Sequence, residues 1–293
     1  MATLKDILHK IGAVKKTQQI TRAMNMVAAA KLRSTQDRMQ RFDPYARKFA
    51  EALENLSSRV DSDIHPLLVK REHVSRVELL HFSSDRGLCG SFNMNNIYLT
   101  ENWAREQKKN SRDYAFTVIG RKGRDYFRKR DYNITASHVQ LYGKVDISFI
   151  NHMAGDFIAR FINSEMDELY MTYSRFINVS KQEPALVKLI PIEPPKRQDK
   201  EDAEKAKEYI FEPSARDLLI ELLPKHIGVQ ILNAFLQNEV SEHAARMAAM
   251  DNATRNCKEM VGDLTLVYNK ARQAAITAEL MDIVSGAEAI RGT

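Results

Sequence analysis

The sequence predicts an α/β protein: a central Rossmann-like α/β domain with a mostly parallel sheet, and a long antiparallel coiled coil formed by the N- and C-terminal helices. Heptad-like apolar patterns at both chain ends predict the coiled coil. Strands alternating with helices between them predict the sheet. We place the N-terminal helix at 1–60, the α/β domain at 70–193, a charged linker at 194–208 and the C-terminal helix at 209–293.

The N-terminal segment is expected to be one long helix. Gln18 and Thr21 interrupt its apolar stripe. Asp43 could cap a new helix that has Pro44 at its first position, so we expect a bend or restart there. The apolar and small residues recur with a period close to 3.5: Leu4, Ile7, Leu8, Ile11, Val14, Met24, Ala28, Leu32, Met39 and Phe42.

The C-terminal segment carries a longer stripe, which runs from Val240 to Ala275 in ten steps and so has the heptad spacing of a left-handed supercoil. A helix over 228–285 would be roughly 87 Å long and would need a partner along its length. The N-terminal helix is the only comparable element. Alanines on both sides of the expected seam allow an interaxial distance near ~8 Å and hence a slender rod. They are Ala28, Ala29 and Ala30 on one side and Ala244, Ala245, Ala248 and Ala249 on the other.

The central segment alternates strands and helices, which predicts parallel pairing and a final hairpin. The charged stretch PPKRQDKEDAEKAKE follows it and has too few apolar residues to pack. The expected helices lie near 88–108, 121–130 and 145–164. The expected strands are 75–82, 114–120, 133–137, 168–179 and 185–192.

Composition excludes several classes of protein. A chain of 293 residues with 44% hydrophobic content can bury a core, and no stretch approaches ~18 uninterrupted apolar residues. Cys89 and Cys257 form no CxxC pair, which indicates a reducing compartment. The eight histidines show no metal-ligand spacing, so we expect no metal and no cofactor. The basic, amphipathic start resembles a transit peptide, but it lacks serine, contains Asp6 and keeps its helical pattern beyond residue 30.

The positive charge is concentrated at the N-terminal end. Residues 1–60 hold twelve Lys and Arg and five acids, a net charge of +7, whereas the whole chain carries +6. This indicates an acidic partner for the first helix, or else a solvated helix face. Nucleic acid is an alternative partner, but no aromatic residue precedes Phe42 to stack on bases.

The stretch SSDRGLCGSFN, at 83–93, poses the question of a nucleotide site because two glycines follow an apolar strand. It has no lysine after Gly90, so it is not a Walker loop, and GxGxxG is also missing. The stretch 120–123 holds a second pair of glycines in a strand-to-helix turn. Close packing and positive φ explain both turns without a ligand. No nucleophile and base are paired in the sequence, so we expect no enzyme activity; a nucleotide-binding enzyme is the alternative.

Several separated motifs resemble the gamma subunit of F-type ATP synthases, from the first helix to the last. They are KKTQQITRAMNMVAAAKLR (15–33), SDRGLCGSFN (84–93), VIGRKG (118–123), EHAARMAAMDNAT (242–254) and VYNKARQAAITAELMDIVSGAEA (267–289). The resemblance implies a central rotor shaft. Rotation of the c-ring, driven by protons, would turn the shaft and drive the catalytic beta subunits through their conformations for ATP synthesis or hydrolysis.

The same resemblance implies the partners and the location. The partners would be the alpha and beta subunits of the hexamer, the epsilon subunit and the c-ring of the membrane sector, with no nucleic acid. The subunit itself would bind no nucleotide, and the chain would be held at the membrane only through the complex. A peripheral protein at the cytoplasmic face of the bacterial inner membrane is expected, with a processed mitochondrial chain as the alternative.

The resemblance also implies contact residues. Arg272, Gln273 and Thr277 match positions that meet a polar loop of beta, although three polar residues on a solvated helix face give the same pattern. Met24 matches a methionine at the shaft–beta contact, and a core methionine fits its spacing equally well. Tyr209 and Glu212, in YIFEP, match the segment that touches the c-ring and epsilon, with Phe211 where some members have tyrosine.

Overall fold

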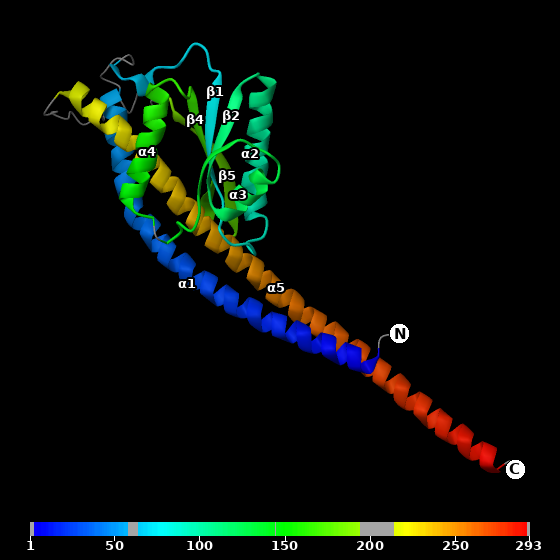
Figure 1. Ribbon diagram of the computed structural model, residues 1–293. Coiled ribbons are helices and arrows are strands. Elements are labelled where there is room, and N and C mark those ends of the chain that lie inside the picture. Colours follow the sequence, from blue (N-terminus) through cyan, green and yellow to red (C-terminus); the bar gives the residue numbers. More distant parts are fainter. Residues whose placement is uncertain (1–2, 58–63, 144, 194–213, 292–293) are drawn as a thin grey trace, which may run out of the picture. The chain divides into compact units, whose positions relative to one another are not determined.

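The computed structural model describes residues 3–57, 64–143, 145–193 and 214–291 (Figure 1). The chain divides into two compact units, and each is described by itself. The coiled-coil unit comprises Met1–Ala28 and Met247–Thr293, and the α/β unit comprises Ala29–Arg246. The predicted charged linker at 194–208 lies outside the described residues.

Two long helices run through both units. Helix α1 spans Leu4–Ser57 and helix α5 spans Ala215–Arg291. The structure thus confirms a long helix at each chain end. It extends α5 beyond the expected 228–285 at both ends, and Pro224 lies inside the helix. The helix continues through this proline because Leu219, Leu223 and Ile227 are all fully buried in the core of the α/β unit.

In the coiled-coil unit the two helices pair in opposite directions. The hydroxyls of Thr21 and Thr254 lie 2.8 Å apart, and the side-chain amide of Asn25 donates to the carbonyl of Met247 at 2.9 Å. Ile7 and Ile11 are buried in the seam, as predicted, but Leu8 is half exposed.

Thr21, which interrupts the apolar stripe in the sequence, lies inside the seam between the two helices and forms a polar layer there. Thr21 is 9% exposed, and Thr254, to which it bonds, stands in the predicted stripe of the other helix. A hydrogen-bonded pair in an otherwise apolar seam favours one register, because any slip leaves both hydroxyls buried without each other.

A substitution at Ala28 tests whether the two helices pack closely at the seam. It is 2% exposed, so Ala28→Leu should overpack its site and lower the free energy of unfolding by roughly 1–3 kcal/mol. Ala30, two residues along the same helix, is exposed, and Ala30→Leu should leave stability within about 0.5 kcal/mol. Urea unfolding of both variants measures the difference, and equal midpoints would contradict a closely packed seam at Ala28.

The α/β unit contains one five-stranded sheet. Its strands are β1 (Arg76–Phe82), β2 (Asp113–Ile119), β3 (Ile134–His138), β4 (Glu168–Asn178) and β5 (Lys181–Ile190). Their order is β3-β2-β1-β4-β5; the first four are parallel, and β5 pairs antiparallel with β4. The helices are α2 (Phe92–Lys109), α3 (Arg121–Arg128) and α4 (Ile147–Ile162), and a short 3₁₀ turn covers Pro66–Leu68. The predicted sheet, crossover helices and final hairpin are confirmed.

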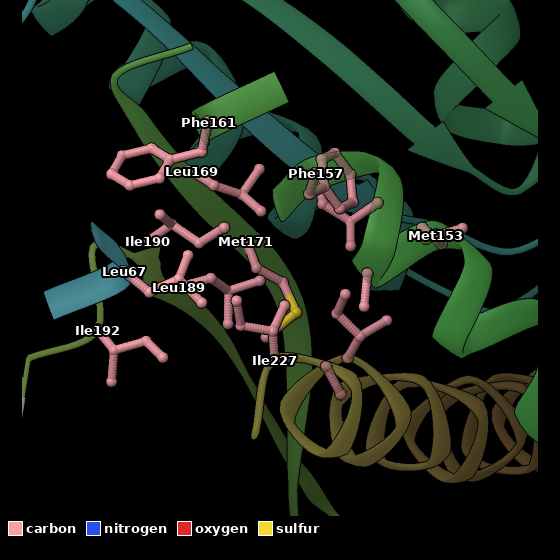
Figure 2. Close-up of a cluster of buried hydrophobic side chains, with 14 of the residues drawn as sticks. Leu67, Met153, Phe157, Phe161, Leu169, Met171, Leu189, Ile190, Ile192 and Ile227 are labelled. Carbon is pink, nitrogen blue, oxygen red and sulfur yellow. The ribbon is translucent and has the colours of Figure 1, made fainter. Parts of the chain in front are cut away.

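Two apolar clusters hold the unit together. Trp103 of α2 and Phe127 of α3 pack with Phe116 of β2 in the smaller cluster. The larger cluster joins α4, α5 and the end of α1 to β1, β4 and β5. Figure 2 shows side chains of α4, β4, β5 and α5 converging in this cluster: Met153, Phe157, Phe161, Leu169, Met171, Leu189, Ile190 and Ile227.

Of the bend or restart expected at Pro44, the restart is wrong. Pro44 lies inside α1, and Asp43, instead of capping a new helix, forms an ion pair with Arg47 at 2.7 Å. The helix continues because its last turns bury Leu53 and Leu56 in the larger cluster, and this packing outweighs the hydrogen bond that proline cannot make.

By length and composition, α5 contains one window of 18 residues apolar enough to cross a membrane, with a mean hydropathy of 1.2. The window is 39% buried inside the protein, and core helices of soluble proteins pass the same test. It is weak evidence of a membrane span.

Candidate functional site

The end of α5 pairs with no other helix in the described part of the chain, and it has an exposed apolar surface. The pairing of Thr21 with Thr254 and of Asn25 with Met247 sets the antiparallel register. That register places Leu4, where α1 begins, level with about residue 270. Figure 1 shows the red end of α5 continuing past the N-terminal end of α1. We call residues 272–287 the tip of α5.

The tip exposes large apolar residues that would otherwise lie in a core. Sequence analysis did not identify them, because the stripe was followed only as far as Ala275. The sequence did contain a signal for them, because apolar residues continue at helical spacing beyond the part of α5 that pairs with α1. The residues are Ile276, Leu280, Met281, Ile283 and Val284, each between 49% and 68% exposed.

Three of the predicted contact residues lie together on this tip. Arg272, Gln273 and Thr277 are exposed, and the Thr277 hydroxyl donates to the Gln273 carbonyl at 2.9 Å. The side chains of Gln273 and Thr277 share one helix face because they are four residues apart.

Met24 lies apart from them. It is half buried on α1, and the register places it level with about residue 250 of α5. That is more than 20 residues, or about 30 Å along the helix, from Arg272. The structure therefore does not bring the four residues into one site. Tyr209 and Glu212 lie outside the described residues.

The glycine loop at 83–93 has its own structural roles. Gly90 has a φ of 58° and Gly120 a φ of 97°, both in the region that favours glycine. A Cβ on Gly123 would lie 2.7 Å from the His81 ring and from the Ser83 hydroxyl. The structural interpretation of these turns is confirmed at three glycines; Gly87 has neither a positive φ nor a close contact.

The place where a Rossmann-type sheet binds nucleotides is filled by α5. In this sheet the strand order switches sides between the parallel strands β1 and β4, and ligands of such sheets bind at that point, beyond the carboxyl ends of the strands. Asn238 of α5 occupies this crevice and is fully buried. Its Oδ1 accepts from the Ser174 amide of β4 at 3.1 Å and from the Asn96 side chain of α2 at 3.4 Å. The protein's own helix thus takes the position of a ligand.

A hollow of about 280 Å³ lies at the opposite ends of the strands. Arg76 and Asp113, the first residues of β1 and β2, line it together with Asn133. Glu78 and Arg160 also face it and form an ion pair with each other. None of the glycine loop lines the hollow. Among residues 3–57, 64–143, 145–193 and 214–291, no group of three His, Cys, Asp or Glu side chains is arranged to hold a metal.

A buried ion pair within α5 lies against the glycine loop, which its arginine contacts. Glu242 and Arg246 lie 2.8 Å apart, and Arg246 also donates to the carbonyls of Arg86 and Gly87 at 3.1 and 3.3 Å. Burial raises the pKa of Glu242 to about 7, although Arg246 opposes this shift. One Glu242 carboxylate oxygen has no hydrogen-bond partner in the described part of the chain.

Glu242 should make stability depend on pH. Because its pKa is higher in the folded than in the unfolded chain, its contribution is fully present below about pH 4.5 and is lost as the pH rises through about 7. Burial lowers the pKa of the neighbouring His243 to about 4, which acts in the opposite direction. Thermal unfolding at pH 5 and pH 8 should therefore be compared between the parent and Glu242→Gln. The melting temperature of the variant relative to the parent should rise from pH 5 to pH 8; a constant difference would contradict the shifted pKa.

The family model and the relatives match nearly the whole chain. The family model described as ATP synthase matches residues 3–290. The chain is 53% identical over 291 residues to the ATP synthase gamma chain of Syntrophus aciditrophicus, covering 99% of each. It is 50% identical over 292 residues to that of Syntrophobacter fumaroxidans, covering 99% of this chain and 100% of the relative.

Solved structures share the fold. A chain in the rotor of the Euglena gracilis mitochondrial ATP synthase has a TM-score of 0.63 and 22% identity, covering 93% of this chain and 98% of that one. A chain in the central stalk and c-ring structure of the Tetrahymena thermophila mitochondrial ATP synthase has a TM-score of 0.58 and 22% identity, covering 80% and 99%. At 22% identity these matches show that the chain shares the fold of those proteins.

Proposed function

The chain belongs to the ATP synthase gamma chain family, and we propose that it works by turning the tip of α5 inside a ring of alpha and beta subunits. The gamma chain is the non-catalytic central stalk of the enzyme, and it couples rotation to conformational change at the catalytic sites. The observation that carries the proposal is the exposed apolar tip. An isolated helix that exposes Leu280, Met281 and Ile283 is expected to be covered by a partner.

The proposed contacts with beta are assigned from the positions of the residues along α1 and α5. Arg272, Gln273 and Thr277 form the polar part of the tip and would bond a polar loop of beta. Met24, half buried on α1, would meet beta at a different level along the coiled coil. Each contact would form with one beta subunit and break as the stalk turns to the next, so each orientation of the stalk favours a different beta conformation.

The proposal extends to the other partners and to the location. Tyr209 and Glu212 would contact the c-ring and epsilon, a role supported only by the resemblance. The subunit is part of a membrane-bound ATP synthase and its relatives at 44–53% identity are bacterial, which supports a position at the cytoplasmic face of the inner membrane. It would reach the membrane only through the complex.

Hydrogen exchange tests the proposal. In the assembled complex the amides of 276–287 should exchange more slowly than in the isolated chain, because the ring would exclude water from the tip. Amides of 231–240, which lie in the α/β unit, should change little and serve as the control. Equal exchange at the tip in both samples would mean that no partner encloses it.

A further inference from the structure

Helix α5 takes the place of a missing strand beside β4. β4 pairs with β1 only from Glu168 to Thr172, because β1 ends at Phe82. Beyond that point the strand presents unpaired backbone groups on its β1 side. The amides of Ser174 and Phe176 donate to the side chains of Asn238 and Gln237, both at 3.1 Å.

The pairing continues over the next turn of the helix. The Ser241 hydroxyl donates to the Ser174 carbonyl at 3.1 Å, so this residue of β4 has both its backbone groups bonded to α5. Asn238 and Ser241 are both fully buried. One turn further on, Arg246 donates to the carbonyls of the glycine loop that follows β1.

These bonds differ in kind from the apolar packing around them. The hydrophobic free energy of the apolar contacts is non-directional, so it does not by itself fix the angle of α5 relative to the sheet. A hydrogen bond weakens steeply when its angle departs from linear. Side chains bonded to fixed backbone atoms of β4 therefore resist rotation of α5 about its own axis relative to the sheet.

We propose that Gln237, Asn238, Ser241 and Arg246 form a torque-bearing junction that joins α5 to β4 and to the glycine loop. α5 runs without a break from this junction to the tip. Torque applied to the sheet would enter the helix here, through bonds to β4 and to the glycine loop. This role rests on the proposed function of the chain as a rotating stalk.

The test measures angular stiffness in the assembled complex. Alpha and beta subunits are fixed to a surface, catalysis is stalled with a non-hydrolysable ATP analogue, and a bead is attached to a cysteine introduced on the α/β unit by Lys109→Cys. The Gln237→Ala, Ser241→Ala variant removes two of the three bonds to β4 and should increase the angular variance of the bead about twofold. A second variant, Gln237→Glu, keeps an acceptor oxygen for the Phe176 amide and should retain the variance of the parent.

A matched control variant distinguishes loss of the junction from a general loss of stiffness in the α/β unit. Thr117 bonds Glu78 at 2.7 Å and Tyr170 bonds Glu168 at 2.8 Å, both within the α/β unit and without α5. Thr117→Val with Tyr170→Phe therefore also removes two hydrogen bonds and should leave the variance unchanged. The proposed junction would be wrong if the Gln237→Ala, Ser241→Ala variant had the same angular variance as the parent. It would also be wrong if the control variant showed an equal increase in angular variance. If the parent complex itself showed no ATP-driven rotation, the proposed function would fail instead.

Discussion

Replacing Arg272 and Gln273 by alanine should lower ATP turnover and ATP-driven proton pumping roughly ten- to hundredfold while the subunits still assemble. The proposed contact of the Arg272 guanidinium with a polar beta loop would be charge-assisted and shielded inside the ring, where such a bond contributes about 1.5–3 kcal/mol. It would have to break and re-form at each beta subunit in turn. Loss of this contact should therefore lower the rate of ATP turnover more than it weakens the association of the subunits.

The chain offers a matched control for this double variant. Asn269 and Lys270 are an amide and a cation, both exposed, on the same helix just before the tip. Asn269→Ala with Lys270→Ala should keep turnover within about twofold of the parent. ATP hydrolysis, pumping and subunit content in membranes are measured together. Unchanged turnover in Arg272→Ala, Gln273→Ala would show that these residues make no rotational contact, and loss of the complex with normal specific activity would make them assembly residues.

Gly120→Ala should prevent the α/β unit from folding stably. Gly120 has a φ of 97°, and an added Cβ would lie 2.1 Å from the carbonyl oxygen of Ser83. Backbone cannot move away as a flexible side chain can, and the Gly120 amide is already fixed by a hydrogen bond to the His138 carbonyl. We expect a loss of roughly 4 kcal/mol or more, which is most of the stability of an ordinary domain.

Two other glycines separate the causes of that loss. Gly143 also has a positive φ, 79°, but open space around it, so Gly143→Ala should cost only the backbone strain of about 1–3 kcal/mol. Gly155 lies in α4 with open space, and Gly155→Ala should stabilise the protein by about 0.5–1 kcal/mol. Urea unfolding of the three variants should rank them in this order. A Gly120→Ala variant as stable as Gly143→Ala would contradict the close approach to Ser83.

The predicted boundaries of the domains remain predictions. The two units divide both terminal helices, after Ala28 and after Arg246, at points that no change in composition marks. Local sequence shows where a helix can form. Which part of it joins which unit depends on contacts with residues far away in the chain.

By itself the sequence determined the secondary structure and the apolar stripes along which the two terminal helices pair. Apolar runs that alternate with helical segments mark the buried strands, and heptad apolar patterns mark the buried faces of the long helices, so β1 to β5, α2 to α4 and the stripe up to Ala275 could be predicted. The motifs of the terminal helices, together with those at 84–93 and 118–123, were enough to identify the family. Positive φ at Gly90 and Gly120 was also predictable, because few other residues adopt it.

Only the tertiary structure decided what fills the crevice between β1 and β4 and where the tip begins. Gln237, Asn238 and Ser241 look in sequence like polar residues on a solvated helix face, yet they pair with the backbone of a strand more than 60 residues away. The exposure of Leu280 and Ile283 likewise depends on where α1 begins and on the register with α5. Both features are set by contacts between distant segments, and the pattern of residues within one segment carries no record of them.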